Sequence, residues 1–207
     1  MKFSSEFADE LDELLRWRRD VRHFRREPLP DGLLESLLER AALAPSVGYS
    51  QPWRFVRVDE SERRSAVIAS FERANAAALA SYHGDDAHHY AQLKLAGLRE
   101  APVHLAVFCD EATRTGKGVG RATMPEMLDY SAVMAVFVVW LAARARGIGM
   151  GWVSILEPDI VTATLEVPTD WRLIAYLCIG YPTEENDTPE LARTGWEHRQ
   201  PIEILAR

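Results

Sequence analysis

A carboxylate inside an arginine cluster is the feature of this sequence with the clearest chemical content. Asp20 lies between Arg18, Arg19 and Arg22 in Trp17-Arg18-Arg19-Asp20-Val21-Arg22. Three guanidinium groups suit a phosphate, because each offers a planar fork of donors to anionic oxygens. A carboxylate would repel that anion. Asp20 is therefore either a structural ion-pair partner of the arginines or a group that moves a proton.

A second candidate is the loop from Ala44 to Phe55, which is rich in turn-forming residues. Its small residues allow the backbone to approach a flat ligand closely. Pro45 and Pro52 reduce the entropy cost of holding the loop open, and the amide of Gln51 both donates and accepts hydrogen bonds. These properties predict a ligand-binding loop.

Other familiar sites fit the sequence less well. The glycine-rich stretches 116–120 and 147–151 do not spell G-x-G-x-x-G between a strand and a helix, and no Walker A pattern occurs, which argues against a Rossmann site. The histidines of 83–89 lie in one polar turn, so a solvated helix start is favoured over a metal site. Ser154 lacks a G-x-S-x-G context, and its spacing alone is typical of a strand serine bonded to backbone.

Composition limits the class of protein. The 207 residues carry a net charge of −7, with 47% apolar and 27% charged residues, which disfavours nucleic-acid binding and predicts one domain over 1–207. Cys109 and Cys178 lie in apolar runs and are interpreted as buried thiols in a reducing cytoplasm. No secretory signal is seen at the N-terminus, and the apolar run 132–143 is shorter than the roughly 20 residues of a membrane span. We expect a cytoplasmic protein that binds neither nucleic acid nor membrane.

Periodicity and turn residues predict the elements that position these candidates. Helices are expected over 6–18, 31–43 with Asp31 as its cap, 61–82, 88–100, 126–146 and 159–165, and strands over 53–58, 102–110, 152–156 and 173–180, with a final edge strand over 201–205. The stretch 111–124 is predicted to be a mobile loop. The helix over 126–146 is apolar nearly all round, so it is either the core helix or a subunit interface. The order of elements indicates an α+β sandwich, with a mixed sheet flanked by helices.

Taken together, these pieces resemble the flavin-dependent nitroreductase family. The resemblance rests on Arg18-Arg19-x-Val21-Arg22-x-Phe24, on Pro45-Ser46 through Gln51-Pro52-Trp53, and on the helix that runs into Gly147-Ile148-Gly149. It implies an interlocked homodimer with FMN at the interface. The first motif would grip the FMN phosphate and ribityl chain, and the Pro-Ser loop would come from the partner subunit and pack on the isoalloxazine.

Two departures from the usual family pattern are Asp20, where a serine is common, and Tyr49, where an asparagine is common. With Ser154 and the tail 195–199, they resemble a subgroup that forms 5,6-dimethylbenzimidazole, the lower ligand of cobalamin. Its members use reduced FMN as a substrate and molecular oxygen as co-substrate, with no metal, and erythrose 4-phosphate is the other product. A flavin reductase is a possible partner that supplies the reduced FMN.

The resemblance also implies roles for individual residues. Asp20 would be the general base at a ribityl hydroxyl, and Ser154 would orient or relay a proton. The residues expected to contact FMN are Arg18, Arg19, Asp20, Val21, Arg22, Pro45, Ser46, Gln51, Ser154 and Arg199. Burial would raise the pKa of Asp20 and the arginines would lower it, so the sequence leaves the net direction open.

Two alternative functions stay open at this stage. One is an NAD(P)H-dependent FMN reductase that recycles its flavin and reduces nitro compounds, quinones or a corrinoid. The other is a non-catalytic flavin-binding protein. Asp20 and the bulky Tyr49 disfavour the reductase, and a requirement for Asp20 and Ser154 would exclude the passive binder.

Overall fold

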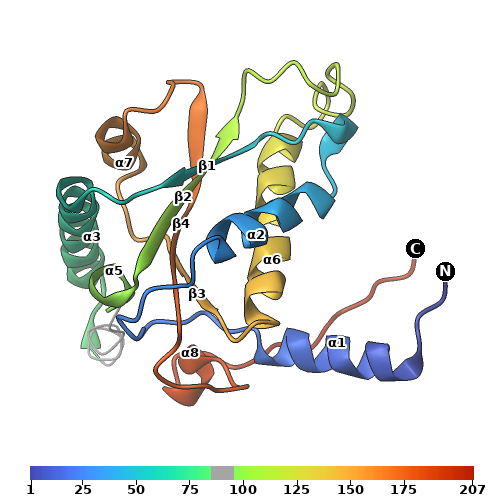
Figure 1. Ribbon diagram of the computed structural model, residues 1–207, viewed down its shortest axis with the longest axis horizontal. Coiled ribbons are helices and arrows are strands. Elements are labelled where there is room, and N and C mark those ends of the chain that lie inside the picture. Colours follow the sequence, from blue (N-terminus) through green and yellow to red (C-terminus); the bar gives the residue numbers. More distant parts are fainter. Residues whose placement is uncertain (85–95) are drawn as a thin grey trace.

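The computed structural model describes residues 1–84 and 96–207, and a four-stranded antiparallel sheet lies at its centre (Figure 1). The strands are β1 (Trp53–Arg57), β2 (Val103–Asp110), β3 (Gly149–Val153) and β4 (Trp171–Gly180), in the spatial order β1-β2-β4-β3. The α+β prediction is confirmed. The expected mixed sheet is wrong, because all three strand pairings are antiparallel and the described chain has parallel pairing only at the isolated bridge between Asp20 and Met150.

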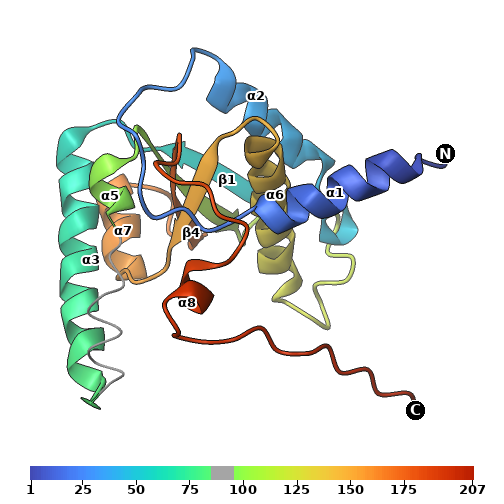
Figure 2. The ribbon, with the colours of Figure 1, turned by 90° about the horizontal axis from the view of Figure 1, so that it is seen from below.

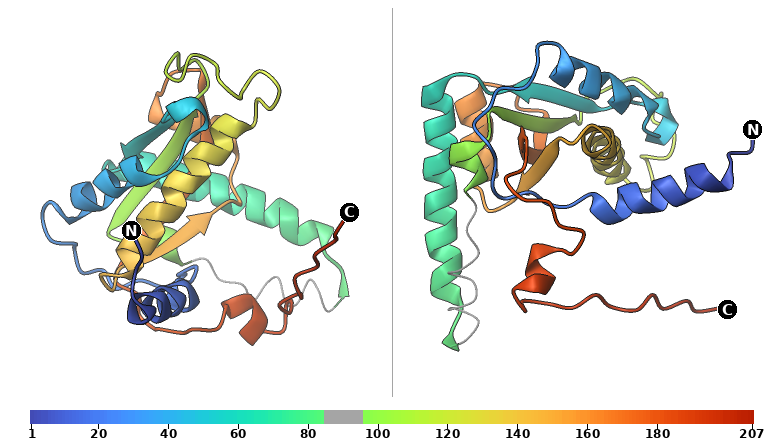
Figure 3. Two further views of the ribbon diagram at one scale, coloured as in Figure 1. Left: turned by 90° about the vertical axis from the view of Figure 1, so that its right-hand side faces the viewer. Right: turned by 60° about the horizontal axis from the view of Figure 1, so that its bottom comes forward.

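Helices cover both faces of the sheet (Figures 1 and 3). One face packs against α2 (Leu33–Glu39), the 3₁₀ turn η1 (Arg40–Leu43) and α6 (Met127–Arg144); the other packs against α3 (Ser61–Ser81), α5 (Gly97–Glu100) and α7 (Pro158–Leu165). Alternation along β2 explains the two cores. Leu105 and Val107 belong to the α6 side, whereas Ala106 and Phe108 belong to the α3 side.

The predicted core helix is confirmed as α6. Its residues Ala135, Val136, Val139 and Ala143 are buried in the core on one side of the sheet. Gly147 ends this region with a φ of +71°, which a glycine adopts without strain. Among the described helices, α6 is the one long and apolar enough to cross a membrane by length and composition, a test that core helices also pass.

The two ends of the chain lie outside these layers (Figure 2). Helix α1 (Ser5–Trp17) is capped by the Ser4 hydroxyl, which accepts a hydrogen bond from the Phe7 N–H, yet none of its residues is buried. At the other end, the short helix α8 (Glu190–Arg193) is followed by an extended, exposed tail. Both ends thus leave apolar side chains uncovered in the isolated chain.

Several sequence-based boundaries need correction. Asp31 does not cap α2: Gly32 is the N-cap residue, in a left-handed conformation, and no side chain caps the helix. The strand expected at 152–156 is displaced to Gly149–Val153, and the edge strand expected at 201–205 does not form. Helix α8 was not expected. Most of the helix predicted over 88–100 lies outside the described residues, which show α5 at its end.

Candidate active site

The segment that carries Asp20 runs alongside the outer edge of β3, the strand at one end of the sheet. The Val21 N–H donates to the Met150 carbonyl over 2.9 Å. Two glycines make this approach possible: a Cβ at Gly149 would lie 2.8 Å from Val21 Cγ2, and a Cβ at Gly151 would overlap the Val21 carbonyl oxygen. The glycine-rich stretch of β3 therefore serves close backbone packing, and this packing fixes where Asp20 lies.

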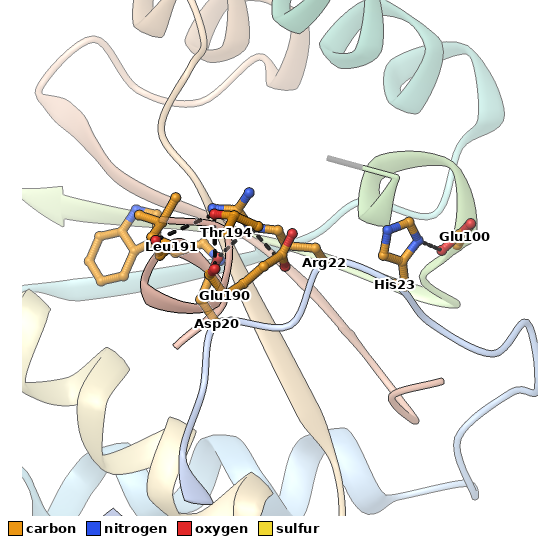
Figure 4. Close-up of polar contacts among 8 residues, drawn as sticks. Asp20, Arg22, His23, Glu100, Glu190, Leu191 and Thr194 are labelled. Atoms are coloured by element: carbon orange, nitrogen blue, oxygen red, sulfur yellow. Dashed lines mark hydrogen bonds and ion pairs between the residues drawn. The ribbon is translucent and has the colours of Figure 1, made fainter. Parts of the chain in front are cut away.

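The Asp20 carboxylate is held at both oxygens. Oδ1 accepts a hydrogen bond from the Trp152 N–H over 2.8 Å, and Oδ2 lies 3.7 Å from Arg22 Nε (Figure 4). The side chain is 40% exposed, and it stands at the wall of a cleft of about 290 Å³. The cleft is lined by Arg19, Asp20, Val21, Arg22, His23, Thr183, Glu184, Asn186, Thr188, Glu190, Arg193 and Thr194.

The electrostatics of the cleft give the net direction of the Asp20 pKa, which the sequence left open. Burial raises the pKa of Asp20 above its ordinary value, and the nearby charge of Glu190 adds to the rise. The Trp152 N–H, Arg22 and Arg18 lower the pKa, but their combined effect is smaller. A carboxylate beside arginines would ordinarily be a weaker base than a free one, and here it is a stronger one.

Two arginines of the cluster keep unused donors. The Arg22 side chain is only 11% exposed, and its Nε and Nη1 are buried with no hydrogen-bond partner in the described structure. The Nε of Arg18 is also buried with no hydrogen-bond partner in the described structure, and the Arg18 guanidinium lies 5.0 Å from the ring centroid of Trp140. Buried guanidinium donors without acceptors fit an anionic or hydroxyl-bearing ligand.

Arg19 and Arg199 lie within electrostatic reach of one another. Burial lowers the pKa of Arg19, and the positive charges of Arg18 and Arg199 lower it further, against a smaller rise from Asp187. Arg19 Nε also donates to the Asp187 carbonyl over 2.7 Å. Mutual repulsion of this kind is relieved when an anion binds between the cations.

Ser154 lies directly after β3, two residues beyond the N–H that holds Asp20, and its side chain is exposed. Its hydroxyl has no hydrogen-bond partner within the described residues, so the interpretation as a strand serine bonded to backbone is wrong. The position at the exit of β3 leaves the hydroxyl free for a ligand.

The loop that contains Pro45, Ser46 and Gln51 is tightly held. The Ser46 hydroxyl accepts from the Gln51 N–H over 3.1 Å, and the Val47 N–H donates to Ser131 Oγ over 3.0 Å. Within it, η2 (Val47–Tyr49) ends in Tyr49, 72% exposed. Tyr49 and Gln51 have φ values of +58° and +46°, strained conformations of the kind that often mark binding sites.

This loop and the arginine cluster lie at opposite ends of α6 (Figure 1). Ser131 near the start of the helix holds the loop, while Trp140 near its end contacts Arg18. Nine residues of α-helix separate these two anchors, about 13 Å along the axis. Within one chain, the structure therefore does not bring the loop residues together with Asp20.

Three residues that contact the segment 20–24 could not be recognised in the sequence. Glu190 Oε2 lies 3.5 Å from Arg22 Nε, and the Trp152 N–H binds Asp20. Glu100 Oε2 accepts from the Phe24 N–H over 3.0 Å and lies 3.4 Å from His23 Nδ1 (Figure 4). No local motif marks these partners, which lie 76 to 168 positions from the residues they contact in the folded chain.

The described residues contain no group of three or more histidine, cysteine, aspartate or glutamate side chains placed to hold a metal ion. The stretch 83–89, considered above for its histidines, lies largely outside the described residues.

Comparison with known proteins places the chain in a family. The sequence model of the "Nitroreductase family" matches residues 15–181. A 5,6-dimethylbenzimidazole synthase of Rhodospirillum rubrum is 58% identical, covering 99% of this chain and 97% of the relative. One of the same name from Rhodobacter capsulatus is 47% identical, covering 98% of each.

Solved structures agree in fold. Iodotyrosine deiodinase, solved with FMN and 3-iodo-L-tyrosine, has a TM-score of 0.73 at 24% identity, covering 95% of this chain and 97% of that one. A nitroreductase-like protein of Streptococcus mutans has a TM-score of 0.68 at 18% identity, covering 95% and 100%. With a family match over most of the chain and full-length relatives far above 30% identity, this chain belongs to the nitroreductase family.

Proposed function

We propose that this protein fragments reduced FMN with molecular oxygen, releasing 5,6-dimethylbenzimidazole, the lower ligand of cobalamin, and erythrose 4-phosphate. The observation that carries the proposal is Asp20, a carboxylate of raised pKa held by a backbone N–H inside an arginine-lined cleft. The names of the two full-length relatives support the same activity.

The arginines fit the phosphate and ribityl end of FMN. Arg18 and Arg22 offer buried N–H donors without acceptors, and Arg19 repels Arg18 and Arg199 until an anion lies between them. In the proposed reaction FMN supplies the ring that becomes the benzimidazole, and oxygen is the oxidant. The protein binds and orients the substrate, and it contributes the proton transfers.

Asp20 is the proposed general base at a ribityl hydroxyl. Burial raises the pKa of this carboxylate, which makes Asp20 a stronger base than a free aspartate. The hydrogen bond from Trp152 fixes Oδ1 and leaves Oδ2 turned toward Arg22 and the cleft. Ser154, whose hydroxyl is free at the end of β3, is the proposed proton relay. Val21 contributes its backbone contact to β3, which sets the position of Asp20.

The complete site is proposed to need a homodimer. Pro45, Ser46 and Gln51 would reach the flavin of the partner subunit, because they lie at the other end of α6 from Asp20 in their own chain. Exposed apolar side chains supply a surface for this association. They lie on α1 (Phe7, Leu11, Leu15), on α6 (Tyr130, Val133, Met134, Phe137) and on the tail (Ile202, Ile204, Leu205).

The location and the supply of substrate are also proposals. Cys109 and Cys178 are buried free thiols, which fits a reducing cytoplasm. Reduced FMN would come from a separate flavin reductase.

The direct test is aerobic incubation with chemically reduced FMN, followed by mass spectrometry for dimethylbenzimidazole and erythrose 4-phosphate. Asp20→Asn should bind oxidised FMN and keep the oligomeric state of the wild type but form neither product, whereas Asp31→Asn, at an exposed turn, should behave as wild type. Intact FMN as the sole product, with NAD(P)H turnover, would instead support a recycling reductase.

The shared site is tested by mixing two chains. We expect Gln51→Ala to be nearly inactive on its own, as Asp20→Asn is. If Asp20 and the loop act across the interface, a mixed dimer of the two variants holds one unaltered site. Random re-association makes half of the dimers mixed, so about a quarter of the wild-type activity should return. No recovery, with mixed dimers present by mass, would place both residues in a site within one chain.

A further inference from the structure

Arg22 lies between two carboxylates that come from distant parts of the chain (Figure 4). Its Nε is 3.7 Å from Asp20 Oδ2 and 3.5 Å from Glu190 Oε2. Neither contact is a hydrogen bond, and Nε and Nη1 have no hydrogen-bond partner within the described residues. One buried cation is thus shared by two acids instead of being bound tightly by one.

Glu190 is held in this place by its own helix. It is the first residue of α8, and its carbonyl accepts hydrogen bonds from the N–H and the hydroxyl of Thr194, at 2.9 and 3.1 Å. Its side chain is 27% exposed and lines the same cleft as Asp20 and Arg22. The second carboxylate is therefore a built part of the cleft wall, since the fold of α8 directs it there.

Sharing changes the chemistry that Asp20 can perform. A carboxylate paired fully with an arginine is stabilised in its ionised form and is a poor base. When a second carboxylate competes for the same guanidinium, each acid is neutralised less, and a negative charge nearby makes protonation easier. Burial is the main cause of the raised pKa of Asp20, and the charge of Glu190 adds a smaller rise that agrees with this geometry.

We propose that Glu190 is a positioning residue for Asp20: it shares Arg22, keeps that cation from neutralising Asp20, and so keeps Asp20 basic enough to take a proton from the ribityl chain. The proposal rests on the proposed function for its last step. The coupling between the three side chains stands independently of it.

The other charged groups around Asp20 must be considered with Glu190. Arg18 and the Trp152 N–H lower the pKa of Asp20, and Cys178 of β4 lies close enough for Asp20 to raise its pKa. Arg19, His23, Glu184 and Arg193 line the cleft as well. Glu184 and Glu190 both line the cleft. Glu190 forms an ion pair with Arg22, whereas Glu184 forms none with Arg22 in the described part of the chain. Glu184 is therefore the matched control.

The test compares wild type, Glu190→Gln, Glu190→Asp and Glu184→Gln. With ¹³C-labelled aspartate, the Asp20 carboxyl resonance is assigned by its loss in Asp20→Asn, and its midpoint is followed against pH without FMN. We expect the midpoint to fall in Glu190→Gln, because Arg22 then pairs with Asp20 alone. It should stay near the wild-type value in Glu190→Asp, which keeps the charge, and should change less in Glu184→Gln.

Product formation gives the second measurement. In Glu190→Gln the acidic limb of the pH–rate profile should move to lower pH. The plateau rate should fall about three- to tenfold, a small part of the roughly 10²–10⁴-fold that general-base catalysis contributes. A residue that merely anchored α8 would lower thermal stability without moving either pH midpoint.

The outcomes separate the two proposals. An unchanged Asp20 midpoint in Glu190→Gln, or an equal fall in Glu184→Gln, overturns the role of Glu190. If the Asp20 midpoint falls in Glu190→Gln but the wild-type protein forms no benzimidazole, the coupling stands and the proposed function is removed. A shifted midpoint with an unshifted pH–rate profile shows that Asp20 is not the base.

Discussion

Gly151→Ala is the perturbation that tests most directly how the fold positions Asp20. An added Cβ would overlap the Val21 carbonyl oxygen, which is backbone and cannot rotate aside. The segment 20–22 would have to move away from β3. That movement breaks two hydrogen bonds, from the Val21 N–H to the Met150 carbonyl at 2.9 Å and from the Trp152 N–H to Asp20 Oδ1 at 2.8 Å.

The expected magnitude follows from these contacts. Each hydrogen bond contributes about 1 kcal/mol net, and forcing an extra methyl group into a packed site costs about 1–3 kcal/mol. Replacing glycine by alanine restricts the unfolded chain and returns about 0.4–1 kcal/mol. The free energy of unfolding should therefore fall by about 2–4 kcal/mol, and Tm by roughly 5–15 °C for a chain of this length.

Gly149→Ala is the matched control on the same strand. Its Cβ would lie 2.8 Å from Val21 Cγ2, a side-chain atom that can shift or be removed. Val21→Ala should therefore relieve the effect of Gly149→Ala but not that of Gly151→Ala. The assay is thermal unfolding at one fixed chain concentration, because association contributes to stability. A loss below about 1 kcal/mol in Gly151→Ala, or equal relief of both variants by Val21→Ala, would refute this account of the contact.

Three further outcomes are expected. Asp20→Asn should be more stable than wild type at pH 7, by roughly 1–3 °C in Tm after allowance for its partial exposure. The folded protein raises the pKa of Asp20, so ionisation of Asp20 lowers stability as pH rises through that pKa. The difference in Tm between Asp20→Asn and wild type should vanish at pH values below the pKa of Asp20 in the unfolded chain. A difference that persists there would show that packing causes it. Arg22→Lys should weaken binding of oxidised FMN about tenfold or more, measured by flavin fluorescence, because an ammonium cannot replace two buried guanidinium donors; unchanged affinity would remove Arg22 from the phosphate or ribityl contact. Ser46→Ala should lower Tm by about 2–4 °C by leaving the Gln51 N–H without its acceptor, and wild-type stability would show that water replaces the hydroxyl.

The elements predicted most accurately are those whose signal is contained in their own sequence. The apolar stretch of α6 and the buried strands β2 and β4 were placed within a few residues, because continuous burial selects continuous apolar runs. The strand β3 was displaced because Gly149 and Gly151 are typical of loops. Gly149 leaves room for the Val21 side chain and Gly151 for the Val21 backbone, and Val21 lies more than 100 residues earlier. The strand expected at 201–205 failed because alternation alone does not supply a neighbouring edge.

Some parts of the candidate site could likewise be predicted from the sequence, and others could not. Asp20 and the arginines could be selected from the sequence, because their types and spacing conflict with a simple phosphate clamp. The direction of the Asp20 pKa could not, since it depends on burial, on the Trp152 N–H and on Glu190. Helix α8 has four residues, too few for a periodic signal, so the second carboxylate of the cleft was invisible before folding.

The cost of Asp20 to the fold favours the fragmentation reaction over a recycling reductase. A carboxylate whose pKa is raised by the folded protein destabilises that protein once it is ionised. A flavin reductase passes electrons through the isoalloxazine and has no step that requires a base beside the ribityl chain, so an uncharged residue at position 20 would serve it better. A reaction that breaks the ribityl chain does require one. Local destabilisation that persists at a site is expected where function needs it. Greater stability together with complete loss of benzimidazole formation in Asp20→Asn would show that Asp20 lowers stability and is needed for the reaction.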